Sequence, residues 1–159
     1  MYKNKVWIVD NFLSKKECKS FINFFKKNEN LMFNWFDTKV INLDLDQDFL
    51  EIKKRYDSIM PNIVIHWWQV VKWPENAKQD LHVDVVQHDP HKKPPLTSIT
   101  YLNDDYEGGQ TMFEDGCRFS PKTGRLLVFD GQHYKHGVTK VTKGIRYTVP
   151  CWYKNENNT

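Results

Sequence analysis

Hydrophobic and polar positions follow two different periods along the chain. In the first sixty residues apolar side chains recur at helical spacing, whereas from residue 62 onward short β-rich runs are separated by Gly, Pro and Asp. Runs that are rich in β-branched and aromatic residues and bounded by turn formers are typical of strands. Besides a short strand at 6–10, the strands expected are 63–73, 81–87, 97–102, 110–114, 125–130, 136–142 and 145–153.

Two helices are expected before the β-rich part. Ser14, with Glu17 three residues later, forms a capping box, which is typical of a helix start. The aromatic residues at 21, 24 and 25 then share one helical face, which predicts packing in the core. A second helix is expected from about Asp46 to Met60, where Pro61 ends it.

Helices followed by seven or eight short strands favour a mainly β (α+β) fold, with the two N-terminal helices packed on one sheet of a jelly roll. With 159 residues the chain is long enough for one domain with its own core. We therefore expect residues 1–159 to form a single domain. Its expected parts are a helical support region at 1–61, a jelly-roll core at 62–153 and a frayed tail at 154–159.

Composition and charge exclude several classes of protein. The net charge is only +3 and is spread over both halves of the chain, so nucleic acid is not an expected partner. No apolar run approaches the length of a membrane span. The three cysteines, Cys18, Cys117 and Cys151, are odd in number and far apart, which fits neither a disulfide framework nor a zinc knuckle. We expect reduced thiols and a cytoplasmic location.

The stretch "DLHVDVV" carries the strongest candidate for metal chemistry. If it is a strand, His82 and Asp84 point to the same side, with Val83 facing away. His136, in "KHGVTKV", is the preferred third ligand because it opens a β-like run. Two imidazoles and one carboxylate form the triad of non-haem Fe(II) oxygenases. A His-x-Asp motif alone is weak evidence, since it also occurs as an ordinary surface pair.

Four other histidines compete for roles in the site. His133 is the main alternative third ligand, although it falls in the turn "DGQHYK". His88 shares strand parity with 82 and 84 and could complete a small zinc site, but nearby prolines indicate that the strand has ended. His66 lies in an apolar strand and is expected to be a core or stacking residue. His91 lies in a polar loop and is expected to be exposed.

Four segments together resemble the prolyl-4-hydroxylase-like 2-oxoglutarate/Fe(II) dioxygenases. In chain order they are "IVDNFLSKKECKSFINFF", "QVVKWPENAKQDLHVDVV", "SITYLNDDYEGGQTMFED" and "PKTGRLLVFDGQHYKHGVTKVTKGIRYTVPCWY". Their order and spacing agree along almost the whole chain. The resemblance implies a double-stranded β-helix, which is a form of jelly roll.

Roles follow from this resemblance position by position. The iron ligands would be His82, Asp84 and His136. Arg146 would grip the distal carboxylate of 2-oxoglutarate, a task that suits a guanidinium fork. Tyr101 would be a second donor to that carboxylate, and Thr148, on the same strand face as Arg146, would assist. Trp73 stands where many relatives have a tyrosine near the iron-bound end of the co-substrate; an indole donates one hydrogen bond and accepts none.

The resemblance also implies a function. The protein would use Fe(II), 2-oxoglutarate and O2, with ascorbate (vitamin C) as reductant, to hydroxylate an amino-acid residue, with peptidyl proline as first choice. Peptides, proteins or free amino acids are thus the expected substrates. Hydroxylation of another side chain or small metabolite is the nearest alternative. A non-catalytic, metal-binding jelly-roll module is the alternative from another class, and a nucleic-acid demethylase is a weaker third.

Two further features concern access to the site. Trp67 and Trp68 are adjacent in a strand and so point to opposite faces, which predicts one in the core and the other lining the site. The loop 86–96 follows the metal strand and is rich in Pro, Lys and His. It is equally consistent with a mobile lid and with a solvated connector.

Overall fold

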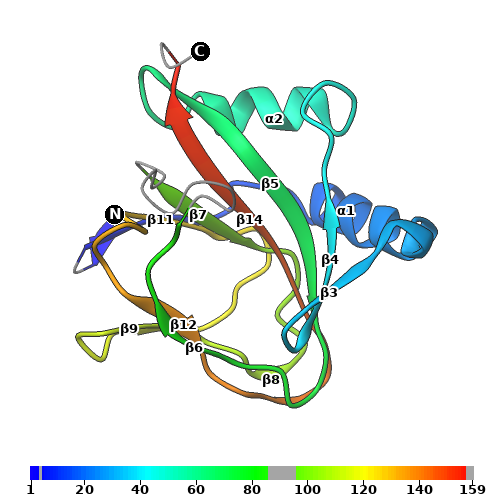
Figure 1. Cartoon of the computed structure of the whole chain (residues 1–159), viewed down its shortest axis with the longest axis vertical. Coiled ribbons are helices and arrows are strands. Elements are labelled where there is room, and N and C mark those ends of the chain that lie inside the picture. Colours follow the sequence, from blue (N-terminus) through cyan, green and yellow to red (C-terminus); the bar gives the residue numbers. More distant parts are fainter. Residues whose placement is uncertain (4, 86–95, 157–159) are drawn as a thin grey trace.

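Two antiparallel sheets face each other and form most of the molecule (Figure 1). The computed structural model describes residues 1–3, 5–85 and 96–156. The large sheet has eight strands in the order β1 (Tyr2–Lys3), β2 (Val6–Val9), β11 (Leu126–Phe129), β7 (Thr97–Tyr101), β14 (Arg146–Asn155), β5 (Ile63–Trp73), β4 (Thr38–Asn42) and β3 (Phe33–Trp35).

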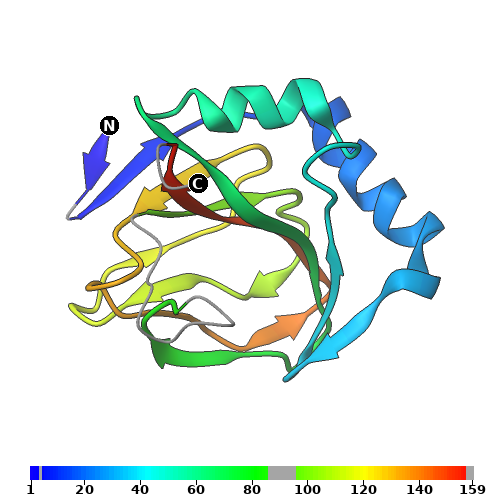
Figure 2. The same cartoon turned by 45° about the horizontal axis from the view of Figure 1, so that its top comes forward.

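The small sheet closes the other side. Its four strands are β10 (Arg118–Phe119), β9 (Thr111–Phe113), β12 (His136–Val138) and β6 (Gln79–His82), and a separate pair joins β13 (Val141–Lys143) to β8 (Glu107–Gly108). Segments distant in sequence pair in both sheets, as β14 does with β5 and β7. The arrangement is the double-stranded β-helix that was expected, and the two sheets are seen nearly edge-on in Figure 2.

Both helices, α1 (Lys15–Lys27) and α2 (Leu50–Asp57), lie on the outer face of the large sheet (Figures 1 and 2). A short 3-10 helix, Glu29–Leu31, follows α1. The capping box is present as predicted, with Ser14 Oγ accepting from the Glu17 N–H at 3.1 Å and the Glu17 carboxylate accepting from the Ser14 N–H at 2.9 Å. Phe21 and Phe25 are fully buried against this sheet. The predicted packing of α1 is therefore confirmed.

The second helix is shorter than the predicted range of 46–60. Before it, the Asp44 carboxylate accepts from the Asp46 N–H at 2.8 Å, and the Asp48 carboxylate accepts from the Asp44 N–H at 2.7 Å. Such side-chain bonds offer the backbone an alternative to helix. After it, the N–H of Ser58 bonds to the carbonyl of Arg55, three residues back, which is a tightened last turn.

Several strand predictions need correction. The hairpin β3–β4 lies inside the supposed helical region and was not predicted. The run 136–142 is two strands. In place of the strand expected at 81–87 there is a strand at Gln79–His82, and residues 86 and 87 of the expected range lie outside the described residues. The last strand continues through Lys154 and Asn155, which pair with Val64 and Ile63, so these two residues are not part of a frayed tail.

Alternation along β5 and β14 separates a packed face from an open one. In β5, Trp68 and Val70 are fully buried beneath the helices, whereas Trp67 and Gln69 line a cavity between the two sheets. The same alternation places Arg146 and the next even-numbered residues of β14 in that cavity. This confirms the expectation that one of the two adjacent tryptophans lies in the core and the other lines the site: Trp68 is in the core and Trp67 lines the cavity. The cavity has a volume of about 320 Å³.

Candidate metal and co-substrate site

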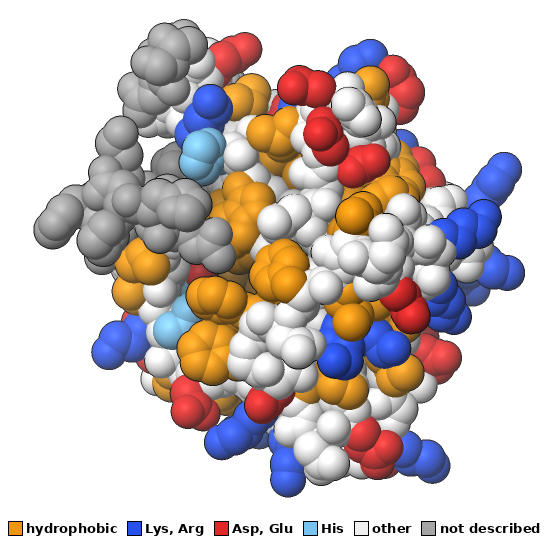
Figure 3. Space-filling view, turned by 45° about the vertical axis from the view of Figure 1, so that its right-hand side comes forward, with side chains coloured by type: hydrophobic (Ala, Val, Ile, Leu, Met, Phe, Trp, Pro, Cys, Tyr) orange, Lys and Arg blue, Asp and Glu red, His pale blue; other side chains and the backbone are white. Residues whose placement is uncertain are grey.

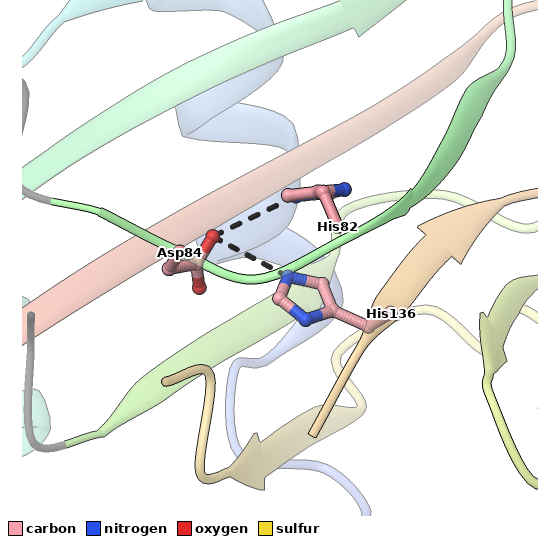
Figure 4. A group of neighbouring side chains, drawn as sticks. All are labelled: His82, Asp84 and His136. Atoms are coloured by element: carbon pink, nitrogen blue, oxygen red, sulfur yellow. Dashed lines mark ion pairs between the residues drawn. The ribbon is translucent and has the colours of Figure 1, made fainter. Parts of the chain in front are cut away.

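Three predicted ligands meet at one end of the cavity. His82 ends β6 and His136 begins β12, and the two residues are directly opposite each other in the ladder. Asp84 follows two residues after β6. Figure 4 shows the three side chains converging, and their ligand atoms all lie within 4.8 Å of one another. Among the described residues no other group of three or more His, Cys, Asp or Glu side chains gathers in this way.

The Asp84 carboxylate is the centre of this group. Its Oδ1 lies 3.4 Å from Nε2 of His136 and 3.7 Å from Nε2 of His82. Burial alone would raise the pKa of Asp84, but hydrogen bonds with His136 and His82 hold it well below its usual range. Burial acts to lower the pKa of His82, yet the Asp84 carboxylate raises it above its ordinary value. The group therefore concentrates a negative charge between two imidazoles.

Backbone carbonyls orient both imidazole rings. Nδ1 of His82 lies 2.9 Å from the carbonyl of Asp80, and Nδ1 of His136 lies 3.1 Å from the carbonyl of Tyr134. A carbonyl at Nδ1 keeps the proton on that nitrogen, because an oxygen without a hydrogen can only accept. Each Nε2 is then left as a lone-pair donor toward the shared centre, which is the arrangement that metal-binding histidines need.

Strand parity does not explain the position of Asp84, which is held by contacts with other segments. It lies outside β6, and its N–H donates to the carbonyl of Gly131 at 2.8 Å. The fully buried hydroxyl of Thr97 donates to its Oδ2 at 2.6 Å, which leaves Oδ1 facing the histidines. A Cβ at Gly131 would collide with both Thr97 Oγ1 and Asp84 Oδ2. Neither supporting residue was predicted from the sequence, where only the "DG" turn at 130–131 indicated a turn at this place.

The competing histidines fall elsewhere. The side chain of His133 is 73% exposed, and its Nδ1 lies 2.9 Å from the carboxylate of Asp130. His66 is exposed, so the expected core role is wrong. His88 and His91 lie outside the described residues, as does almost all of the proposed lid at 86–96.

Arg146 carries an unmatched charge in the cavity wall. It is 1% exposed, and its Nε and Nη1 have no hydrogen-bond partner among the residues that the structure describes. Its Nη2 donates a long bond of 3.4 Å to the hydroxyl of Thr111. The guanidinium lies over the ring of Trp73 at 4.6 Å and over that of Tyr101 at 5.6 Å. A buried cation with free donors in a fixed fork suits a carboxylate ligand.

The other predicted co-substrate residues surround Arg146. Thr148 lines the cavity and accepts a hydrogen bond of 3.3 Å from the indole of Trp73. Trp73 pairs with Arg146 in the sheet and thus lies at the arginine end of the site. The hydroxyl of Tyr101 hydrogen-bonds to that of Thr111 at 2.5 Å, so Tyr101 contacts the guanidinium through its ring.

Tyr106 is a neighbour of Arg146 that the sequence analysis missed. Its hydroxyl is buried and has no hydrogen-bond partner within the described part of the chain. Burial raises the pKa of Tyr106 well above its usual value, although the nearby Arg146 charge acts in the opposite direction. The tyrosine is therefore a neutral donor close to the guanidinium.

The described part of the chain contains no helix that is both long and apolar enough to span a membrane.

Curated relatives cover part of the chain. Human prolyl 3-hydroxylase 2 is 34% identical over an alignment of 91 residues, and the match covers 46% of this chain and 13% of the relative. Chicken prolyl 3-hydroxylase 1 is 35% identical over an alignment of 75 residues, and the match covers 39% of this chain and 10% of the relative. The match thus spans only about a tenth of the length of these proteins.

Solved structures match over nearly the full length. The viral collagen prolyl hydroxylase of Paramecium Bursaria Chlorella virus-1, in its 2-oxoglutarate complex, superposes with a TM-score of 0.74 at 18% identity and covers 96% of each chain. A prolyl-4-hydroxylase of Pseudomonas putida gives a TM-score of 0.72 at 15% identity, over 95% of this chain and 92% of the other. At such identities the likeness shows a shared fold.

The family follows from a direct match of sequence. The profile of the 2OG-Fe(II) oxygenase superfamily matches residues 68–154. This range contains the histidine–aspartate group, Arg146 and every strand from the second half of β5 to most of β14. The chain therefore belongs to the 2OG-Fe(II) oxygenase superfamily.

Proposed function

We propose that this protein is a 2-oxoglutarate- and Fe(II)-dependent dioxygenase that hydroxylates prolyl residues in peptides. One observation carries the proposal: a two-histidine, one-carboxylate group and a buried, unpaired arginine open into the same small cavity. A pure metal-binding module has no use for the second feature. The balanced reaction is 2-oxoglutarate plus O2 plus a substrate C–H giving succinate, CO2 and a C–OH.

The three converging side chains fit a ferrous ion. His82, Asp84 and His136 are the ligands we assign to it. Nitrogen and carboxylate donors in this set suit Fe(II), and three ligands leave coordination positions open for other molecules. When bound, the iron supplies O2 activation and the oxidation of a C–H bond. The chain itself contributes Thr97, which keeps Oδ2 of Asp84 occupied so that Oδ1 faces the metal position.

The arginine end fits a dicarboxylate. Arg146 offers two unpaired donors in a planar fork, which match the two oxygens of a carboxylate. We assign Thr148 and Trp73 to the same subsite, and to Tyr101 a supporting role behind it, where its ring and that of Trp73 hold the guanidinium in place. The chain thereby fixes one end of 2-oxoglutarate and orients its other end toward the triad. Apolar side chains make up most of the surrounding walls.

Proline is the substrate residue favoured by two kinds of support. The curated relatives that match are named prolyl 3-hydroxylases, and one structural neighbour from Trichoplax adhaerens is a prolyl hydroxylase in complex with a hypoxia-inducible-factor peptide fragment. The cavity walls beyond the triad and Arg146 consist mainly of aromatic and aliphatic side chains, among them Val40, Val71 and Ile99. A neutral, compact ring suits such walls.

Succinate release tests the proposal. The purified protein is incubated with Fe(II), ascorbate and 2-oxoglutarate, alone and with blocked peptides that contain proline, asparagine, aspartate or lysine. We expect slow succinate formation without peptide, faster formation with proline peptides, and a peptide mass gain of one oxygen atom. Succinate at the level of a metal-free blank under every condition would refute the enzyme; stimulation by another peptide alone would refute proline.

Three accessory proposals go with this function. Ascorbate is the reductant that keeps the iron ferrous, so its omission should shorten the period of linear turnover. Residues 1–159 form a single domain, so thermal unfolding should show one transition. The location is cytoplasmic, which fluorescence microscopy or fractionation of the source cells can check.

A further inference from the structure

Two exposed aromatic rings stand at the mouth of the cavity. Trp35 and Phe36 form the tip of the β3–β4 hairpin, which was not predicted, and both line the cavity. Trp35 is 46% exposed and Phe36 is 84% exposed. Their rings meet edge to face with centroids 5.3 Å apart. Large apolar groups left so open beside a site mark a surface that contacts another molecule.

The turn itself does not call for a phenylalanine. Phe36 has a φ of +48°, in the left-handed region where glycine and asparagine are favoured and a bulky residue is strained. The tip is held by other groups: Thr38 Oγ1 donates to the Trp35 carbonyl at 2.7 Å, and the Asp37 carboxylate accepts from the Lys78 N–H at 3.3 Å. The strained position therefore presents an aromatic ring at the mouth, at some cost in stability.

A second pair of rings continues this surface. Trp67 of β5 and Trp152 of β14 stack with centroids 4.3 Å apart, and both line the cavity. The indole of Trp67 donates to the Asn42 side chain at 3.0 Å, which fixes its orientation. We call Trp35, Phe36, Trp67 and Trp152 the aromatic rim. Figure 3 shows hydrophobic side chains gathered around a hollow on one face of the molecule.

We infer that the aromatic rim binds the substrate peptide next to the hydroxylated residue, and that it prefers an apolar or prolyl neighbour there. The inference rests on the proposed function. A cavity of about 320 Å³ is small for a ligand site and is shared with the dicarboxylate, so it has room for one substrate side chain. Neighbouring residues of a bound peptide must then lie at the mouth, where the rim is continuous with the cavity wall.

The chemistry of the rim points to an uncharged peptide segment. Aromatic faces recognise apolar side chains and proline rings, as grooves for proline-rich peptides do. Lys78 is the charged side chain of the described cavity lining that lies outside the triad and Arg146, and it is 58% exposed beside Asp80. The described lining therefore selects for shape and apolar contact more than for free charged ends. A peptide fits this surface better than a free amino acid does.

Kinetics with defined peptides test the inference. The probes are two blocked peptides with a central proline, one flanked by leucine and one by serine, and free L-proline. The wild type should show the lowest KM for the leucine-flanked peptide. Trp35→Ala and Phe36→Asn should each raise this KM about tenfold. Trp35→Phe should restore most of the loss.

Two controls separate the rim from the fold and the chemistry. Succinate formation without peptide and the KM for 2-oxoglutarate should stay unchanged in both rim variants. Phe36→Asn should have a melting temperature equal to or above that of the wild type, because asparagine tolerates the left-handed turn. Leu31→Ala removes another exposed apolar side chain, outside the cavity lining, and should leave every KM unchanged.

The outcomes distinguish failure of the inference from failure of the function. No succinate from the wild type, even without peptide, refutes the proposed function. If the wild type forms succinate normally without peptide, either of two results overturns the inference about the aromatic rim and leaves the proposed function standing. One is that the KM for the leucine-flanked peptide does not change in the rim variants. The other is that free L-proline is used at least as well as both peptides.

Discussion

The unmatched charge of Arg146 yields the sharpest prediction. Replacing it with methionine keeps much of the side-chain volume and removes the guanidinium. If Arg146 is buried because it binds a carboxylate, its unpaired donors must lower the free energy of unfolding when no ligand is bound. Arg146→Met should therefore stabilise the ligand-free protein while it weakens binding of 2-oxoglutarate.

The magnitude follows from the contacts. Nε and Nη1 are buried without partners, and each such donor costs about 1–3 kcal/mol. The ring of Trp73, 4.6 Å from the guanidinium carbon, returns about 0.5–2 kcal/mol. The two donors together cost about 2–6 kcal/mol, so after the ring contact is subtracted we expect a net gain of about 2–3 kcal/mol in the free energy of unfolding, with Tm rising by about 2–4 °C for each kcal/mol.

Thermal unfolding with and without 2-oxoglutarate, in the presence of Mn(II), measures both effects. At a concentration of about 100 Kd the co-substrate should stabilise the wild type by about 2.7 kcal/mol. It should stabilise Arg146→Met much less, because loss of a charge-assisted bond weakens binding by about tenfold or more. Arg146→Lys keeps the positive charge but loses the planar fork of donors, so its stabilisation by 2-oxoglutarate should lie between those of the wild type and Arg146→Met. The reasoning would be refuted if Arg146→Met were less stable than the ligand-free wild type and were stabilised by 2-oxoglutarate to the same extent.

Three further predictions concern the triad and α1. Thr97→Val should lower the affinity for Mn(II), measured by calorimetry, by about tenfold, whereas Thr97→Ser should not; equal affinities would contradict the positioning role. His136→Ala should abolish Mn(II) binding and His133→Ala should leave it intact, and the reverse result would move the third ligand. Hydrogen bonds from Arg55 hold the pKa of Glu17 at about 2, below its ordinary value of 4.5. This depressed pKa stabilises the protein above about pH 4.5, and the contribution is lost as the pH falls toward 2. In urea titrations Glu17→Gln should therefore cost about 1 kcal/mol at pH 7, after allowance for solvent screening of this partly exposed pair, and much less at pH 2; a cost independent of pH would contradict it.

Local signals in the sequence predicted the fold well where they were strong. The capping box at Ser14 and the β-rich run at 63–73 predicted α1 and β5 correctly. The start of α2 was misplaced because bonds between aspartate side chains and backbone compete with helix in 44–48. The β3–β4 hairpin was missed because its turn contains Phe36 in the left-handed region, where the usual signal is glycine or asparagine.

The candidate site was predictable in its residues and less so in its geometry. His82, Asp84 and His136 were predicted from the sequence, and the structure brings them together; their role as ligands remains a prediction. Parity assigned Asp84 to a strand, whereas bonds to Thr97 and Gly131 actually hold it. Such support comes from segments that are distant in sequence, so no local pattern reveals it.

Oxygen labelling tests the central claim most directly. The wild type, Asp84→Ala and His136→Ala are incubated with Fe(II), 2-oxoglutarate and isotopically labelled O2, and the succinate is analysed by mass spectrometry. We predict one labelled oxygen atom in the succinate formed by the wild type, and no succinate above the metal-free blank from either variant. Unlabelled succinate, or labelled succinate from both variants, would contradict a dioxygenase centred on these residues.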